Sequence, residues 1–196
     1  MEVTDINSLD LNKLYTYSDY YTWKFQERVE LIKGKIFKMS PAPSRQHQKI
    51  AVTLTGIFYN HFLEHTCEVY PAPFDVRLLV ARKSQPALAE TVVQPDLCVV
   101  SDLSKLDDRG CVGAPDLVVE ILSPGNSKKE MHEKFEVYQE AGVKEYWLVN
   151  PHEALVLIYL LNDDGEFIGK PPVVSGMELH SYIFPELKLQ LSELFK

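Results

Sequence analysis

Two short segments of this sequence begin alike and then run apolar: Pro95–Val100 (PDLCVV) and Pro115–Glu120 (PDLVVE). A β-strand that is apolar on both faces is buried on both faces, so both segments are predicted to lie inside one sheet. The second run continues to Leu122 with an acid, Glu120, in its middle. A buried carboxylate loses much hydration free energy unless a cation or hydrogen-bond donors replace the water. A salt bridge, a capped carboxylate or a metal site would each do so.

The geometry of these strands decides which acids could share a metal ion. If strands 92–100 and 116–122 are antiparallel neighbours, the start of the first lies beside the end of the second. Asp96 and Glu120 are then adjacent. Asp116 shares a face with Glu120 but lies four residues away, roughly 13 Å at about 3.3 Å per residue. We therefore predict Asp96 and Glu120 as metal ligands and Asp116 as a strand-start or turn residue.

The composition fits one compact domain that spans residues 1–196, with residues 1–30 as an N-terminal helical extension that packs its Tyr and Trp rings on the body. The chain has 196 residues, of which 45% are hydrophobic and 24% charged, and this excludes a disordered protein. Its three cysteines form no C-x-x-C pair, which argues against a disulfide framework or zinc ribbon and fits a reducing cytoplasm.

The apolar runs, the N-terminus and the net charge of the chain further limit the class of protein. The longest apolar run, Ala154–Leu161, is too short to span a membrane, and the acidic N-terminus is unlike a secretory signal, so a cytoplasmic protein is expected. The net charge of -8 argues against nucleic-acid binding through a broad positive surface. Basic residues gather in two places: Lys128, Lys129 and Lys134, and Arg77, Arg82 and Lys83.

Hydrophobic periodicity and turn residues predict alternating strands and helices. We expect a hairpin over Glu30–Met39 that turns at Lys33-Gly34, helices over about 46–65 and 128–141, strands over 74–80, 92–100, 116–122, 143–149, 155–161 and 181–184, and an apolar end over 187–195. A capping box of Ser127 and Glu130 begins the second helix, and Gly142 ends it. This order predicts an α/β fold with a mixed central sheet flanked by helices.

The second helix carries a lysine where an apolar residue is expected. Its apolar stripe contains Met131, Phe135 and Tyr138, and Lys134 lies inside that stripe. Since the helix directly follows the Glu120 strand, Lys134 either extends to solvent or points at the buried carboxylates. Two carboxylates and a lysine are what a Mg²⁺-dependent phosphodiesterase needs, because the acids hold the ion and the lysine orients the attacking water.

Several motifs together resemble the PD-(D/E)XK restriction-endonuclease-like superfamily and, within it, the Uma-two nuclease family. They span about Glu30 to Phe195: Glu30-Leu-Ile-Lys-Gly34, Pro73–Val76, Val93–Asp96, Gly113–Pro124, Lys134, Tyr138, Gly142-Val143 and Glu145–Pro151. The resemblance implies a restriction-endonuclease-like core and a metal-dependent endonuclease. The expected enzyme hydrolyses phosphodiester bonds of nucleic acid, most simply DNA, with Mg²⁺ as cofactor and Mn²⁺ as its substitute.

The resemblance also assigns site residues. The superfamily aspartate falls on Asp96 and the second acid on Glu120, but Leu122 stands where the superfamily has its lysine. In families of this type the lysine can come from the following helix, at the position of Lys134. Glu30 is an additional site acid by resemblance or, equally, part of a hairpin-edge salt bridge.

His47 lies near the start of the first helix, on the same face as His61. It is an exposed or capping histidine or a further site residue. The sequence His61-Phe-Leu-Glu64-His65 matches a zinc-peptidase pattern, but a packed histidine explains His61 more simply. A catalytically silent binding module with the nuclease fold is the other alternative. A homodimer would suit cleavage of both strands of a duplex, with the apolar end 187–195 as its interface.

Overall fold

A mixed seven-stranded sheet forms the centre of the protein. The structure, a computed structural model, describes residues 2–39, 43–79, 85–123 and 128–196, the side chains of 128–130 excepted. The sheet has the order β12-β11-β10-β9-β6-β3, with β13 beside β11, and only β9 and β10 pair in parallel. Its strands are β3 (Glu68–Pro71), β6 (Leu97–Val100), β9 (Leu117–Ile121), β10 (Glu145–Asn150), β11 (Leu155–Leu161), β12 (Phe167–Gly169) and β13 (Val173–Val174).

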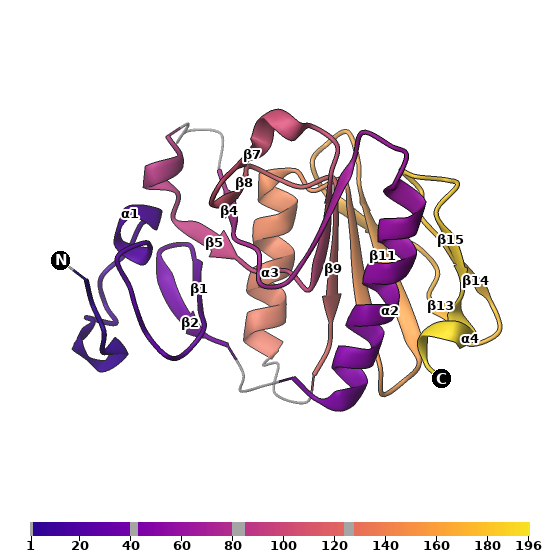
Figure 1. Ribbon diagram of the computed structural model, residues 1–196, viewed down its shortest axis with the longest axis horizontal. Helices are drawn as coiled ribbons and strands as arrows, with labels where there is room; N and C mark the ends of the chain where they lie inside the picture. The colour runs from indigo at the N-terminus through magenta and orange to yellow at the C-terminus, as the bar shows by residue number, and fades with distance from the viewer. Residues whose placement is uncertain (1, 40–42, 80–84, 124–127) are drawn as a thin grey trace.

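Two long helices cover the two faces of this sheet, and β9 lies between them in Figure 1. They are α2 (Arg45–Phe62) and α3 (Lys128–Ala141). Alternate residues of β9 face opposite helices: Val119 packs in the layer with α2, and Val118 packs in the layer with α3. The result is the predicted α/β architecture, a mixed sheet between helices.

A second, six-stranded sheet lies towards the N-terminal end, in the order β2-β1-β5-β4-β8-β7. Its strands are β1 (Val29–Ile32), β2 (Lys35–Lys38), β4 (Val76–Leu78), β5 (Thr91–Val93), β7 (Leu106–Asp107) and β8 (Gly110–Val112). The predicted hairpin is confirmed as β1 and β2. Lys33 and Gly34 connect these strands at φ 49° and 77°, the conformation of a tight two-residue hairpin turn.

The second predicted helix coincides with α3, and Gly142, at φ 88°, follows its end. The capping box of Ser127 and Glu130 lies outside the described residues. The first predicted helix is three residues too long, because α2 ends at Phe62. No helix in the described part of the chain is long and apolar enough to cross a membrane.

The predicted strand over 92–100 is wrong, because the chain changes sheets in its middle. β5 ends at Val93 in the second sheet, and β6 begins at Leu97 in the central sheet. Pro95 has no N–H to donate to a neighbouring strand. The Gln94 N–H donates instead to Glu30 Oε1 at 2.8 Å.

The predicted strand over 181–184 is also wrong. Its polar groups are bound by the buried carboxylate of Glu145, which accepts hydrogen bonds from Ser181 Oγ at 2.8 Å and from the N–H groups of Tyr182 and Ile183 at 3.0 Å. Two short strands lie on either side of this segment, β14 (Glu178–His180) and β15 (Lys188–Gln190).

The apolar end of the chain packs into the core of its own chain. Leu187 and Leu189 are buried there, as are Leu191 and Leu194 of α4 (Leu191–Leu194). The expectation that this segment offers an interface for a homodimer is therefore wrong, because its apolar side chains already have partners.

The first 30 residues form little helix. They contain η1 (Ile6–Ser8) and the single turn α1 (Tyr17–Tyr20), in which Thr16 and Asp19 form a capping box. The expected packing of aromatic rings is present, since Tyr15 and Tyr17 lie in a small core with Leu31 of the second sheet.

Candidate active site

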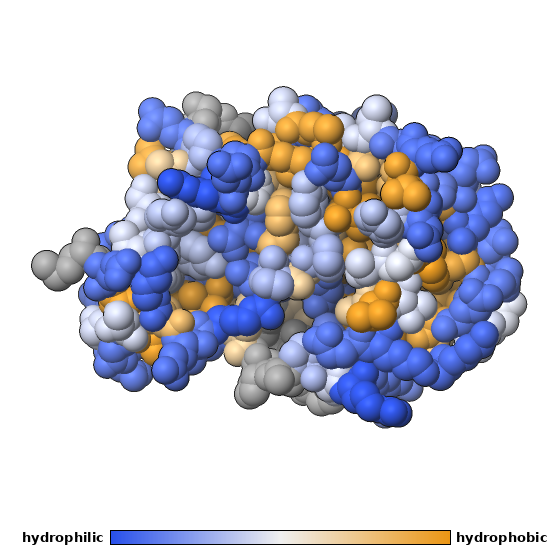
Figure 2. Space-filling view, viewed as in Figure 1, coloured by the Kyte–Doolittle hydropathy of each residue, from blue (hydrophilic) through white to orange (hydrophobic). Residues whose placement is uncertain are grey.

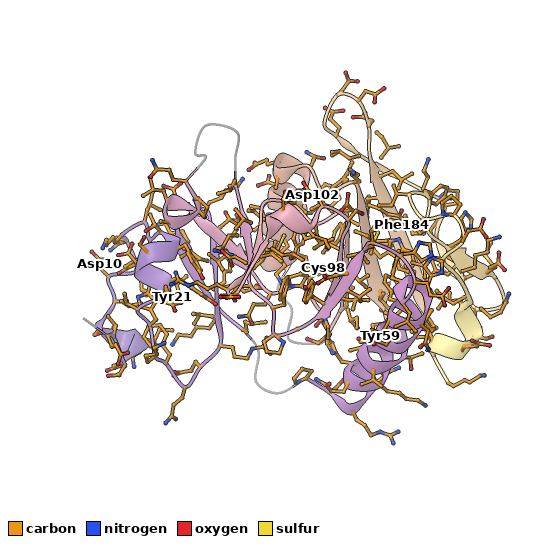
Figure 3. All side chains as sticks on the ribbon, turned by 45° about the horizontal axis from the view of Figure 1, so that its top comes forward. Asp10, Tyr21, Tyr59, Cys98, Asp102 and Phe184 are labelled. Atoms are coloured by element: carbon orange, nitrogen blue, oxygen red, sulfur yellow. The ribbon has the colours of Figure 1, made fainter. Side chains whose placement is uncertain are left out.

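Asp96 and Glu120 face each other across two central strands. The antiparallel register of β6 and β9 pairs Leu97 with Val119, so the next position outward brings Asp96 opposite Glu120. The Ile121 N–H donates to Asp96 Oδ2 at 2.7 Å, which fixes the aspartate against β9. Cys98, two residues after Asp96, lies near the middle of the molecule in Figure 3. The predicted adjacency of the two acids is thus present in the structure.

Lys134 points inward, at the carboxylates. Its Nζ lies 3.0 Å from Glu120 Oε1 and 2.9 Å from Glu30 Oε1, and all three side chains are largely buried. Glu30 comes from β1, in the other sheet, so Lys134 joins acids from both sheets. Glu30 was expected to be either an additional site acid or part of a salt bridge. It forms a salt bridge, and its partner is the candidate site lysine.

Two residues of the resemblance motifs, to which no role was assigned from the sequence, form hydrogen bonds in the site. Tyr138 lies one turn after Lys134 on α3, and its hydroxyl donates to Glu120 Oε1 at 2.6 Å. In the sequence Tyr138 belongs to the apolar stripe and to the motifs of the family resemblance, and its i+4 spacing from Lys134 indicates a shared helix face. Gln94 holds Glu30 through its backbone N–H. Nothing in its sequence context indicates that contact.

His47 is buried beside Asp96. Its Nε2 lies 3.2 Å from Asp96 Oδ2, and its side chain is 8% exposed. The prediction of an exposed or capping histidine is therefore wrong. The helix cap is Ser44, whose hydroxyl accepts a hydrogen bond from the His47 N–H. Burial lowers the pKa of His47, but the hydrogen bond to Asp96 and the charges of Asp96 and Glu120 raise it above its usual value.

The buried charges of the site do not balance. Three acids, Glu30, Asp96 and Glu120, surround one lysine. The pKa of Glu120 is raised to about 7: burial, Asp96 and Glu30 raise it, and together they outweigh the lowering by Lys134 and by the hydrogen bond from Tyr138. Burial alone lowers the pKa of Lys134, but the two glutamates raise it above its usual value, so this lysine stays protonated. With all three acids ionised, the site carries one more negative charge than Lys134 and a protonated His47 neutralise, and a divalent cation would favour that ionised state.

The carboxylates keep oxygens with which to bind such a cation. Donors occupy Asp96 Oδ2 and Glu120 Oε1. Within the described residues, no hydrogen-bond donor reaches Asp96 Oδ1 or Glu120 Oε2. Nor does this part of the chain bring together three His, Cys, Asp or Glu side chains that could hold a metal. Carboxylate oxygens suit Mg²⁺, which keeps several water ligands, so the two-acid set fits this ion.

Asp116 and Leu122 lie outside this cluster. Asp116 accepts a hydrogen bond from the Ser101 N–H at 2.8 Å and pairs with Lys144 at 2.6 Å. This is the structural environment predicted for it at the start of the strand. Leu122, at the superfamily lysine position, packs on the apolar layer under α3.

The residues of the zinc-peptidase pattern, His61 to His65, do not lie on one helix. Because α2 ends at Phe62, Glu64 and His65 follow the helix and are exposed. The rings of His61 and His65 stack with centroids 5.2 Å apart. Among the described residues, no third metal-binding side chain joins them.

Comparison with known proteins identifies the family of this chain. The family model Uma2, described as "Putative restriction endonuclease", matches residues 17–192. The chain belongs to the Uma2 family. A protein of Synechocystis sp. described as "Uncharacterized protein slr1290" is 26% identical over 153 residues, with 76% of each chain covered.

A solved structure supports the fold. The crystal structure of a "putative nuclease belonging to DUF820" from Anabaena variabilis matches with a TM-score of 0.72 and 19% identity, and covers 92% of this Uma2-family chain and 97% of that one. The restriction-endonuclease-like fold expected from the sequence is therefore confirmed.

Proposed function

We propose that this protein is a Mg²⁺-dependent endonuclease that hydrolyses phosphodiester bonds in nucleic acid, with DNA as the simplest substrate. The observation that carries the proposal is the placement of Lys134 against Glu120, directly beside Asp96, in a chain of a nuclease family. A protonated lysine and a surplus of carboxylates, held together in the centre of the fold, form a suitable site for phosphoryl chemistry.

Asp96 Oδ1 and Glu120 Oε2 would hold the Mg²⁺ ion, and Mn²⁺ in its place. A bound ion of this kind stabilises negative charge on the phosphate and lowers the pKa of the attacking water. Ile121 and His47 orient Asp96 through its other oxygen, and Tyr138 does the same for Glu120. These contacts occupy Asp96 Oδ2 and Glu120 Oε1, so the other oxygen of each acid would be the one to bind the ion.

Lys134 acts as a hydrogen-bond donor. Because Glu30 and Glu120 hold it in the charged form, its ammonium group cannot accept a proton from water. It orients the attacking water or binds a phosphate oxygen. Glu30, 2.9 Å from Lys134 Nζ, would keep the lysine at the site when Glu120 holds the ion, and this gives Glu30 a positioning role.

The compartment and the assembly are further parts of the proposal. Cys67, Cys98 and Cys111 are free thiols, which is the usual state in a reducing cytoplasm. Two sites in a homodimer would cut both strands of a duplex. With the C-terminal leucines buried, this interface would have to use other residues.

The test is cleavage of supercoiled plasmid, single-stranded DNA and single-stranded RNA with Mg²⁺, Mn²⁺ or chelator. We expect cleavage by the wild type that requires the metal, and its loss in Glu120→Ala. Glu153→Ala is the matched control, because Glu153 is an exposed acid in the turn before β11. Equal cleavage by wild type and Glu120→Ala would refute the site. No cleavage by either protein would favour the silent binding module.

A further inference from the structure

A nucleic-acid substrate needs positive charge on a chain whose net charge is -8. The basic groups expected from the sequence do not supply it in the described residues. Arg77 is 2% exposed; it pairs with Asp107 at 2.5 Å and lies over the Tyr17 ring. Lys134 is enclosed by the carboxylates of the site. Arg82 and Lys83 lie outside the described residues, as do the side chains of Lys128 and Lys129, so a basic surface is sought here among the other described residues.

Two hollows meet at Gln94, beside the site, and they differ in charge. The larger, about 440 Å³, has Asp75, Asp107 and Asp108 in its wall against one cation, Arg109. Its negative charge repels a phosphate backbone. The smaller, about 220 Å³, is formed by residues 20–29 together with Gln94. Its charged side chains are Lys24, Glu27 and Arg28, so its net charge is positive.

Aromatic rings line this smaller hollow, which we call the aromatic hollow. They are those of Tyr20, Tyr21, Trp23 and Phe25. The Trp23 ring centroid lies 5.7 Å from that of Tyr20 and 5.4 Å from that of Phe25. Figure 3 shows Tyr21 at the N-terminal end of the molecule, far from Phe184, and in Figure 2 apolar side chains lie among hydrophilic ones at that end. Lys24 is exposed, with its Nζ 5.7 Å from the centre of the Tyr21 ring.

The aromatic hollow is joined to the candidate active site through Gln94. The backbone N–H of Gln94 holds Glu30, the partner of Lys134, while its side chain lies in the wall of the hollow. Gln94 Oε1 accepts a hydrogen bond from Arg28 at 2.5 Å, and Arg28 precedes Glu30 by only two residues. A nucleotide bound in the hollow would thus lie next to the residues that position the catalytic lysine.

We propose that the aromatic hollow binds unpaired nucleotides of the substrate, on the strand that leads to the active site. Bases stack on aromatic rings whatever their sequence, and Lys24 and Arg28 supply charge for the backbone. Bases inside a duplex are stacked on each other and cannot stack on these rings. The inference rests on the proposed function and sharpens it: the substrate class is single-stranded nucleic acid or a duplex with an unpaired segment.

Tryptophan fluorescence tests this inference without any cleavage. The chain has two tryptophans, and Trp147 is fully buried, so a ligand that changes the emission by contact reports on Trp23. The full-length protein is titrated in chelator with 12-nucleotide oligo(dT), oligo(U) or a 12-base-pair duplex. We expect saturable quenching by the single strands, with the DNA and RNA arms giving the preference between the two, and much weaker quenching by the duplex.

Two variants locate the binding site. Phe25→Ala removes a stacking ring and should weaken single-strand binding roughly tenfold. Lys24→Glu should weaken it several-fold, and its matched control is Lys188→Glu on β15, at the opposite end of the molecule. Each of these two changes moves the net charge from -8 to -10 (a loss of +1 and a gain of -1), so only position differs. If Phe25→Ala fails to fold, Lys24→Glu still gives the answer, because Lys24 is exposed.

Each outcome separates this inference from the proposed function. Absence of quenching, equal quenching by the duplex, or equal weakening by Lys24→Glu and Lys188→Glu would overturn the inference, even in a protein that cleaves DNA. Saturable quenching that Lys24→Glu weakens and Lys188→Glu does not would support it, even if the protein cleaves nothing and the proposed function fails.

Discussion

Replacement of Lys134 by methionine should destabilise the protein strongly and in a pH-dependent way. Methionine keeps most of the length of the side chain and removes its charge, so Glu30 and Glu120 lose the cation at 2.9 and 3.0 Å. Removal of one partner from a buried ion pair costs about 3–5 kcal/mol. For a chain of this size each kcal/mol lowers Tm by about 2–4 °C, so we expect a decrease on the order of 6–20 °C at pH 8.

The pH dependence follows from the pKa of Glu120, which is about 7 in the folded protein against 4.5 for a free side chain. In the variant this pKa rises further, because Lys134 no longer lowers it. A folded-state pKa above the unfolded one means that the folded protein keeps a proton that the unfolded chain releases. Stability therefore falls as pH rises above about 4.5, and the cost is complete above the folded pKa. The Tm difference between variant and wild type should thus be largest at pH 8 and should shrink towards pH 5.

The assay is thermal unfolding by circular dichroism from pH 5 to pH 8 in chelator. Lys144→Met is the matched control: Lys144 also pairs with a buried acid, Asp116, at 2.6 Å, but its own side chain is 63% exposed. An exposed partner contributes about 1 kcal/mol or less, so the control should lose about 4 °C at most. Equal losses in the two variants, or a Lys134→Met loss that does not change with pH, would refute the argument about buried charge.

Three further predictions concern the metal and two glycines. Mn²⁺ at 100 times its Kd should stabilise the folded wild type by about 2.7 kcal/mol and so raise its Tm, and Asp96→Ala should abolish this rise. A rise in Tm that persists in Asp96→Ala would exclude Asp96 as a ligand. Gly110→Ala should cost about 2 kcal/mol or more in urea unfolding, because a Cβ there would lie 2.1 Å from the Asp75 carbonyl oxygen at φ +121°. Gly56→Ala should instead stabilise by about 0.5–1 kcal/mol, because Gly56 lies within α2 with open space around its Cβ; the opposite sign in either glycine variant would contradict the stated geometry.

The adjacency of Asp96 and Glu120 could be predicted from the sequence because it depends only on counting residues along two paired strands. The apolar runs that contain Asp96 and Glu120 mark two buried strands, and antiparallel pairing of these strands determines which residues face each other. The inward direction of Lys134 was one of two alternatives that helix periodicity left open. Periodicity identifies the face of a helix, whereas the partners of that face are supplied by distant segments.

Glu30 and His47 could be named from the sequence only as possible additional site residues, because their contacts join segments that lie far apart along the chain. Glu30 lies on β1 of the second sheet and Lys134 packs against the central sheet, so their contact depends on how the two sheets meet, and the prediction of one strand over 92–100 missed the change of sheets at Gln94–Asp96. The burial of His47 depends on contact between α2 and the end of β9, which no spacing along the chain reveals. The capture of residues 181–183 by Glu145 likewise joins segments more than 30 residues apart.

The two Pro-Asp segments of the sequence allow a test of whether Asp96, rather than Asp116, forms the active site with Glu120. Asp96 lies beside Glu120, whereas Asp116 lies at the other end of β9 and pairs with Lys144. We would measure the rate of Mg²⁺-dependent DNA cleavage for Asp96→Asn and Asp116→Asn, each checked by circular dichroism for folding. We expect cleavage to fall at least a hundredfold in folded Asp96→Asn and to stay close to wild type in folded Asp116→Asn. Wild-type cleavage by Asp96→Asn, or equal loss in both folded variants, would contradict it.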